Sequence, residues 1–339
     1  MLRILYNTSI DFIRLRRQAA IGIAIFLLPL IPMMFIGGYR YSIEFTGGTL
    51  LQLEFQQRPD VGEVRQLLAE TGFPDAEITN FGENALSIRA RGSDVLEQQA
   101  AQGSSEVARR IETALDQRYG AGSYEVILSE TVGPKVGGEL RTSAIIALLI
   151  AFGLTLIYLA WRFEWRFSLA AVLATVHDIV ATLALIRYMN LEVSLFVVGG
   201  VLTVIGYSMN DKVVVFDRVR ENLRKSRNEP LYDLLNRSVN ETLPRTVMTG
   251  STTLACLLAL LIFGGEVIRP FAWVLTFGIL VGTFSSIYVA SPLLLWIERR
   301  YPRTEAARGK VSAAAARAES EAERRARTPR APQKPAATR

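Results

Sequence analysis

Residues 143–160 read SAIIALLIAFGLTLIYLA, and this stretch without a charged side chain decides the fold class. The hydrocarbon core of a bilayer is about 30 Å thick, and roughly 20 apolar residues in an α-helix cross it. A run of this length and composition predicts a transmembrane helix. Half of all residues are hydrophobic, at 50% of the chain, so we infer an integral membrane protein and not a soluble one.

Five further apolar stretches lie on either side of this one. They are residues 19–37, 167–188, 193–216, 246–264 and 271–297. Arginines precede the first stretch, as in a signal peptide, but residues 36–39 offer no small-x-small cleavage site, so we expect a retained anchor. The fold class that follows is a membrane all-α bundle of six transmembrane helices.

Lysine and arginine side chains in the loops predict which side of the membrane each loop faces. Positively charged flanks resist translocation, so they stay in the cytoplasm. These charges lie in the N-terminal segment 1–18, in the loop 161–166, in the loop 217–245 and in the basic tail 298–339. We expect these four segments in the cytoplasm, with the tail disordered. Residues 38–142 would then form a periplasmic domain, and residues 143–297 a five-helix membrane region.

The composition argues against several classes of site. The net charge is +6, but the excess of positive charge gathers in the tail, so we expect no nucleic-acid partner. The chain has a single cysteine, Cys256, and a single histidine, His177. Neither a disulfide framework nor a His/Cys metal site can be built from them, and we predict no metal.

The segment between the first two spans has the pattern of a soluble domain. Apolar alternation and helical periodicity predict a strand, a helix, two strands, a helix and a strand. The expected ranges are Thr49–Phe55, Val61–Thr71, Ala76–Phe81, Ala85–Arg91, Ser105–Tyr119 and Tyr124–Val132. This order indicates an inserted α+β ferredoxin-like domain. Because it lacks paired carboxylates, a nucleophile constellation and a phosphate-binding loop, we expect a binding or force-transmitting module, with no catalytic residues and no enzyme activity.

Ionisable side chains inside the predicted spans are the candidate functional residues, because a charge in hydrocarbon costs several kcal/mol unless it is paired. Asp178 lies roughly 16 Å along the third span from Phe167, near the midplane, and His177 precedes it. The fourth span places Asn210, Asp211 and Lys212 within the membrane, and Asp217 and Arg218 at its cytoplasmic end.

Asp178 allows two interpretations. In the structural one, it pairs permanently with Lys212 or Arg218 and ties two spans together. In the functional one, it alternates between protonated and ionised forms, because burial favours the neutral acid and a nearby cation favours the carboxylate. Protonation would release the cation and let the helices repack, so that proton passage drives motion. His177 is either a relay for this proton or a residue bonded to a neighbouring helix.

Short motifs recur between about residues 10 and 300. They are Ser42–Thr49, Val132–Leu140, His177-Asp178, Gly206–Asp211, Asp217–Asn222, Thr246–Thr253 and Ser285–Ala290. Together and in this order they resemble the SecD/SecF family of the resistance-nodulation-division (RND) superfamily. The family motif residues matched here include Phe45, Thr46, Gly47, Gly48, Gly206, Tyr207, Asp217 and Arg220. Residues 42–44 read Ser-Ile-Glu where the family more often has Gly-Ile-Asp, and we expect the turn to tolerate this change.

The resemblance implies a role in protein transport. It implies a proton-motive-force-coupled accessory subunit of the Sec translocase, in the bacterial cytoplasmic (inner) membrane. The implied partners are SecD, the SecYEG channel, YidC, YajC and the translocating preprotein, within the lipid bilayer. No cofactor is implied, and the proton gradient, with sodium as the alternative, supplies the energy. The family's intramembrane aspartate corresponds to Asp178; Lys212 suits its basic partner by depth and Arg218 by motif.

Two other functions compete with this expectation. One is a non-conducting structural scaffold of the Sec channel, which requires no titration of Asp178. The other is a subunit of an RND-type small-molecule exporter. Such an exporter normally needs two large exported domains with a substrate cleft, whereas the sequence predicts one small domain.

Overall fold

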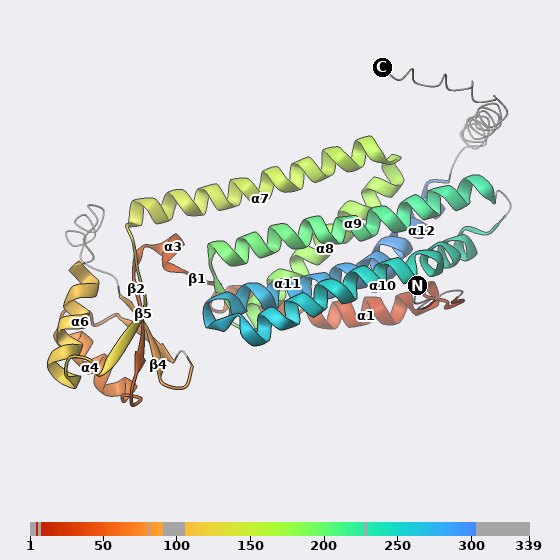
Figure 1. Ribbon diagram of the computed structural model, residues 1–339. Helices are drawn as coiled ribbons and strands as arrows, with labels where there is room; N and C mark the ends of the chain where they lie inside the picture. Colours follow the sequence, from red (N-terminus) through yellow and green to blue (C-terminus); the bar gives the residue numbers. More distant parts are fainter. Residues whose placement is uncertain (1–4, 6–7, 81, 91–105, 227–228, 303–339) are drawn as a thin grey trace, which may run out of the picture.

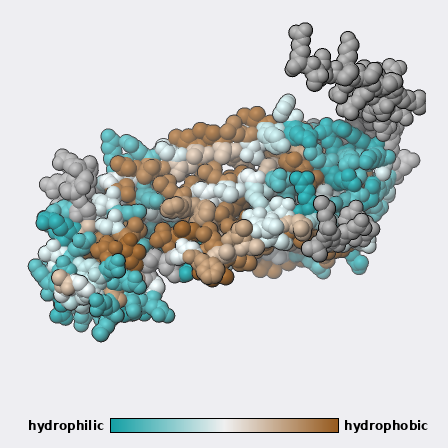
Figure 2. Space-filling model, in the orientation of Figure 1, coloured by the Kyte–Doolittle hydropathy of each residue, from teal (hydrophilic) through white to brown (hydrophobic). Residues whose placement is uncertain are grey.

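The computed structural model describes residues 5, 8–80, 82–90, 106–226 and 229–302. It consists of a bundle of long helices with a small sheet domain at one end (Figure 1). Hydrophobic residues dominate the middle of the elongated molecule, and hydrophilic residues gather at both ends (Figure 2). This distribution is the one expected for a protein whose middle lies in lipid. The expected tail lies, from residue 303 onward, outside the described residues.

The bundle consists of long helices and shorter helical segments that adjoin them. In chain order they are a 3-10 turn (Ile13–Leu15), α1 (Arg16–Leu27), α2 (Leu30–Phe35), α7 (Pro134–Arg162), α8 (Trp165–Tyr188), α9 (Leu195–Lys225), α10 (Leu231–Phe263), α11 (Gly265–Ser285), a π-helix (Ser286–Ala290) and α12 (Ser291–Arg300). Within the described residues, five helical segments are long and apolar enough to cross a membrane. They are Ile13–Met33, Pro134–Arg162, Trp165–Tyr188, Leu231–Phe263 and Val267–Arg300.

Helix α9, which contains the fourth predicted span, is not among these five segments. Its first half is apolar, but the polar run Asn210–Lys212 interrupts that character. The helix nevertheless packs within the bundle, against α8, α10 and α11. A helix that carries polar groups in such a position must bury them against its neighbours.

The segment 217–245, expected as a loop, is mostly helical. Helix α9 continues to Lys225, and α10 begins at Leu231. Ion pairs of Glu221 with Arg218 and Lys225, three and four residues apart, support the last turns of α9. Charge content alone therefore misplaced the ends of these helices, because a solvated helix is as rich in charge as a loop.

The first span is broken in the middle. Pro29 follows the end of α1, and α2 begins at Leu30. Arg187, near the end of α8, donates to the backbone carbonyls of Met33 at 3.2 Å and Ile36 at 2.8 Å. Carbonyls at a helix end lack a partner within the helix, so this arginine ties the first span to α8.

The inserted domain contains a four-stranded antiparallel sheet. Its elements are β2 (Gly48–Phe55), α4 (Val61–Glu70), β3 (Glu77–Asn80), β4 (Ala85–Ala90), α6 (Glu106–Tyr119) and β5 (Tyr124–Val132). The strand order is β3-β4-β2-β5. Leu51 of β2 lies opposite Ile88 of β4, and both belong to a core that also contains Leu68 of α4 and Ile111 of α6. The two helices thus cover one face of the sheet.

Short elements attach this domain to the bundle. Strand β1 (Arg40–Tyr41) pairs in parallel with β6 (Glu192–Val193), which lies between α8 and α9. A four-residue helix, α3 (Ile43–Thr46), follows β1 and packs against α7. Gly47 and Gly48, with φ of 74° and 121°, then turn the chain into β2. The glycine pair is therefore a turn between α3 and the sheet.

Candidate functional site

Asp178 and Lys212 form a buried ion pair between α8 and α9. Their side chains are 1% and 0% exposed, and Lys212 Nζ lies 2.6 Å from Asp178 Oδ2. Because neither charged group is accessible to solvent, each needs the other to offset the free-energy cost of its desolvation. The structure thus brings together Asp178 and Lys212, one of the two cations that the sequence offered.

Two serines and a histidine complete the contacts of the Asp178 carboxylate. Ser285 Oγ, at the end of α11, donates to Oδ2 at 2.8 Å, and Ser208 Oγ of α9 donates to the same oxygen. His177 Nδ1 lies 2.9 Å from the other oxygen, Oδ1. Ser208 is one turn before Lys212 and also contacts its ammonium group. Asp178 is therefore bonded to groups from α8, α9 and α11.

Close helix packing places both serines on the carboxylate. A Cβ atom at Gly282 of α11 would lie 2.8 Å from Cβ and 3.0 Å from Oγ of Ser208. Only glycine permits this approach without a shift, and it brings α11, and with it Ser285, against α9. The π-helix Ser286–Ala290 begins directly after Ser285. Such wide turns inside α-helices are rare and occur often at functional sites.

The threonines one turn before and after Asp178 donate hydrogen bonds to backbone carbonyls of α8 and not to the carboxylate. Thr175 donates to the carbonyl of Ala171 at 2.9 Å, and Thr182 to the carbonyl of Asp178 at 2.8 Å. Both are fully buried. They therefore line the same face of α8 without bonding the carboxylate.

A second buried carboxylate, Asp211, lies on α9 and is 5% exposed. The hydroxyls of Thr246 on α10 and Thr283 on α11 face it, and the charges of Lys212 and Arg245 act on it. Within the described residues, Asp211 Oδ2 and both threonine hydroxyls are buried without a hydrogen-bond partner. Buried polar atoms are rarely left so, and where they are, a functional explanation is warranted. Asp211 Oδ2 therefore has an open hydrogen-bond acceptor position.

The other predicted ionisable residues lie away from Asp178. Arg218 bonds Glu241 at 2.6 Å and Glu221 at 2.7 Å, and Asp217 pairs with Arg162 at 2.5 Å. Asn210 is exposed on the outside of α9. Arg218 is therefore not the partner of Asp178 in this structure, and it pairs with Glu221 and Glu241 instead.

The remaining motif residues are spread over the molecule. Arg220 donates to the carbonyl of Arg162 at 3.4 Å, and Tyr207 contacts Thr253 at 3.5 Å. Gly206 has no side chain near the place where a Cβ would lie. The motif Phe45–Gly48 lies at the inserted domain, where Phe45 is buried. In the described part of the chain, no hydrogen bond or ion pair joins these residues to Asp178 or Lys212.

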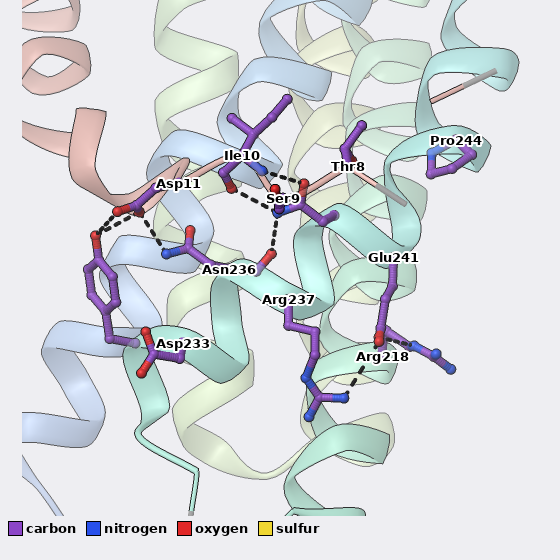
Figure 3. A pocket seen from close by; sticks show the side chains of 12 residues that line it. Thr8, Ser9, Ile10, Asp11, Arg218, Asp233, Asn236, Arg237, Glu241 and Pro244 are labelled. Atoms are coloured by element: carbon purple, nitrogen blue, oxygen red, sulfur yellow. Dashed lines mark hydrogen bonds and ion pairs between the residues drawn. The ribbon is translucent and has the colours of Figure 1, made fainter. Parts of the chain in front are cut away.

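A polar pocket of about 660 Å³ lies where the N-terminal segment meets α10 (Figure 3). Asn240 bonds both the N–H and the carbonyl of Ile10, at 3.0 and 2.8 Å, and Asn236 accepts from the N–H of Ile13 at 3.1 Å. Asp11 accepts from Tyr232 at 2.7 Å. Arg218 lines this pocket, so the two candidate cations serve two different sites.

Sequence reasoning missed Ser208, Ser285, Thr246 and Thr283. A hydroxyl one helical turn before Lys212 could have indicated Ser208. Ser208, Ser285 and Thr246 lie within the short motifs of the sequence, but a single sequence gives no sign of which helices meet. No group of three or more His, Cys, Asp or Glu side chains that could hold a metal occurs in the described part of the chain.

Comparisons with known proteins give concordant matches. A family model described as "Protein export membrane protein SecD/SecF, C-terminal" matches residues 111–300, and a "SecD/SecF GG Motif" model matches residues 34–57. The protein translocase subunit SecF of Gemmatimonas aurantiaca is 54% identical over 308 residues, which cover 90% of this chain and 92% of that relative. The SecF of Pseudomonas aeruginosa is 37% identical and is covered to 92%.

A longer relative and its solved structure are also similar. The protein translocase subunit SecDF of Thermus thermophilus is 42% identical over 270 residues, which cover 79% of this chain and 36% of the relative. The crystal structure of SecDF from Thermus, titled a translocon-associated membrane protein, matches with a TM-score of 0.77 and 38% identity. The match covers 88% of this chain and 40% of that chain.

Proposed function

Because this chain belongs to the SecD/SecF family, among its SecF subunits, we propose that it is an accessory subunit of the Sec translocase that uses the proton motive force to promote preprotein export. The names of its relatives, protein translocase subunits SecF and SecDF, support the transport role. The observation that carries the energetic part is the ion pair of Asp178 and Lys212, buried within apolar helices.

The proposal includes a membrane topology. Helix α9 joins the five apolar segments as a sixth span, with both termini in the cytoplasm of a bacterium and the sheet domain in the periplasm. The distribution of lysine and arginine supports this orientation. The β-α-β-β-α-β order and the strand order β3-β4-β2-β5 support a ferredoxin-like inserted domain.

The proposal also includes partners. A relative whose name and sequence join SecD and SecF in one chain supports association with SecD. Helix α7 is apolar and almost none of it is buried within this chain, so it offers a face to lipid or to partner helices. The SecYEG channel, YidC, YajC and the preprotein follow as further partners from membership in the translocase, and they rest on family likeness alone.

We place the proton-coupling step at the two carboxylates that flank Lys212. Protonation of Asp178 would remove the charge that holds Lys212, and Lys212 could then turn to Asp211, the adjacent carboxylate with an unpaired oxygen. Protonation at Oδ2 would also weaken that oxygen as the common acceptor of Ser208 and Ser285. The contacts between α8, α9 and α11 would then rearrange, so proton passage would become helix movement.

Secretion into inverted membrane vesicles tests this proposal. Vesicles that contain Asp178→Asn, Asp211→Asn or the parent chain, each with SecD and SecYEG, are assayed for preprotein uptake with and without a proton gradient. We expect both variants to assemble and to lose the gradient-dependent stimulation, while ATP-driven uptake continues. The matched control is Asp233→Asn, because Asp233 is exposed at the cytoplasmic end of α10.

A structural scaffold is the second candidate function. The observation that favours it is the full set of partners on Asp178, which is typical of a permanent contact. A scaffold predicts that gradient-dependent stimulation survives in both variants as long as the complex assembles. That result would end the proton-coupling proposal, whereas loss in only one variant would assign the step to that carboxylate.

A further inference from the structure

The inserted domain holds the connection between α8 and α9. Strand β1 pairs with β6 in this connection, and Ser42 N–H donates to the carbonyl of Val193 at 2.9 Å. Arg89 of β4 reaches the same segment, with its Nη2 2.5 Å from Glu192 Oε2. Strand β1, Ser42 and Arg89 therefore hold residues 192–193, which precede the first residue of α9.

Glu44 makes the contact that reaches α9 itself. Its Oε2 accepts the backbone N–H of Leu195, the first residue of α9, at 2.6 Å. The first N–H groups of a helix have no partner inside the helix, and a carboxylate there also interacts favourably with the helix dipole. The local cap, Ser194, accepts from Val197 at 3.3 Å and so leaves the Leu195 N–H to Glu44.

The element that carries Glu44 is fixed on its other side. A Cβ atom at Gly137 of α7 would lie 3.0 Å from the backbone nitrogen of Gly47 and 3.3 Å from the backbone carbon of Phe45. Backbone therefore lies directly on backbone between α3 and α7. Because Gly47 and Gly48 lead straight into β2, helix α3 is joined both to the sheet and to α7.

Helix α9 connects this contact to the buried ion pair. It runs without interruption from Leu195 to Lys225 and carries both Ser208 and Lys212. From Leu195 to Ser208 the distance along the axis is about 20 Å at 1.5 Å per residue. A shift or rotation of α9 that follows a change at Asp178 is therefore delivered to Leu195, where Glu44 is bound.

We propose that Glu44 is a positioning residue that couples α9 to the inserted domain, so that the domain follows the helix when the contacts of Asp178 change. This inference rests on the proposed function, because it takes the Asp178 pair as the origin of the movement. It assigns a role to Glu44, whose carboxylate binds the first N–H of α9.

Hydrogen exchange on the full chain, purified with its membrane partners in lipid nanodiscs, tests the coupling. Asp178→Asn mimics the protonated carboxyl and is compared with the double variants Asp178→Asn/Glu44→Ala and Asp178→Asn/Glu44→Gln. The matched control is the double variant Asp178→Asn/Glu54→Ala, because Glu54 is an exposed glutamate of the same domain. Thermal unfolding of each variant verifies that it is folded.

We expect Asp178→Asn to change exchange both in α9 and in β1 and β2. With Glu44→Ala, the Leu195 amide exchanges about tenfold faster and the change in the sheet domain disappears, whereas the change in α9 remains. Glu44→Gln keeps an acceptor oxygen and restores the response of the domain. An unchanged response of the domain in the Glu44→Ala double variant overturns the inference, as does a domain that never responds to Asp178→Asn.

The proposed function fails by a different result. A parent chain without gradient-dependent stimulation of preprotein uptake refutes proton coupling, whatever the exchange data show. A parent with full stimulation, together with a domain that responds to Asp178→Asn independently of Glu44, refutes only the coupling role of Glu44. The two experiments therefore separate the two claims.

Discussion

Lys212 has a side chain that is 0% exposed, and its ammonium group is bound to Asp178 and Ser208. Arg218, six residues later on the same helix, has a side chain that is 35% exposed and is shared between two glutamates. A charge without access to water is costly to leave alone, whereas a charge at the surface is solvated when its partner is removed. Burial therefore gives these two cations very different energetic importance.

Lys212→Met and Arg218→Met measure that difference. Lys212→Met leaves the buried Asp178 carboxylate without its counter-ion, and breaking a buried ion pair in this way costs about 3–5 kcal/mol. Arg218→Met breaks surface pairs, for which we expect a loss of about 0–1 kcal/mol. Thermal unfolding in detergent gives the comparison. Equal losses would show that the ion pair of Lys212 is not the buried one.

Gly282→Ala tests the approach of α11 to α9. The new methyl group would lie 2.8 Å from Ser208 Cβ, so the helices must separate, at a cost of about 1–3 kcal/mol. The matched control is Gly206→Ala, since a Cβ at Gly206 meets no atom within 4 Å. That change adds helix propensity and is expected to stabilise by up to about 1 kcal/mol. Chemical denaturation of both variants decides, and a neutral Gly282→Ala would contradict the packing argument.

At the scale of single residues, the sequence identifies side chains whose burial costs free energy. It says little about which residues they contact. Asp178 was identifiable because an acid in an apolar run has few explanations. Lys212 and Arg218 remained equal candidates, because depth along a helix does not specify which face it turns to a neighbour. Ser285 was beyond prediction for the same reason, as it reaches Asp178 across 107 positions of the chain.

The N-terminal segment is held to α10 by several contacts, and one of them, Asp11 with Tyr232 and Asn236, depends on a carboxylate. The hydrogen bond from Tyr232 is the largest influence on the pKa of Asp11; with that from Asn236 it outweighs desolvation and places the pKa below its ordinary value of 3.8. A carboxyl with a lowered pKa stabilises the folded form while ionised, and this contribution is lost as the pH falls through the lowered pKa. The contribution of Asp11 to this attachment is therefore present above pH 3.8 and is lost in more acidic solution.

Hydrogen exchange at Ile13, corrected for the intrinsic rate, follows this attachment as a function of pH. We expect protection in the parent to decline as the pH falls below 3.8. Asp11→Asn should exchange faster at neutral pH and lack this decline, and Asp233→Asn should behave as the parent. A decline that persists in Asp11→Asn would assign the acid sensitivity to another group.

The expected strands of the inserted domain agree with the structure. The strand expected at 49–55 lies within one residue of β2, and the strand expected at 124–132 coincides with β5, although β2 is buried along most of its length and β5 is not. The helical ends in 217–245 were missed, since a helix that leaves the membrane loses its apolar signal while keeping its hydrogen bonds. Contacts between elements, such as β1 with β6, depend on two-residue segments too short for any pattern.

The whole molecule has two polar ends, and their chemistry predicts that they face different compartments. In a Cys256→Ser background, Glu54→Cys lies in the sheet domain and Asp233→Cys at the opposite end, both exposed. A membrane-impermeant maleimide added to intact spheroplasts should label Glu54→Cys at once and Asp233→Cys only after permeabilisation. Labelling of both in intact spheroplasts would contradict the proposed topology.

The π-helix after Ser285 acts as a built-in insertion. One residue more than an α-helical turn requires rotates everything that follows by about 100° around the axis. Upstream of it, α11 presents a serine to the aspartate; downstream, α12 presents Leu294 and Leu295 to the bundle core. Helices α11 and α12 can therefore each turn the required face to a different neighbour. Deleting one residue from 286–290 would rotate one of the two helices away from its neighbour.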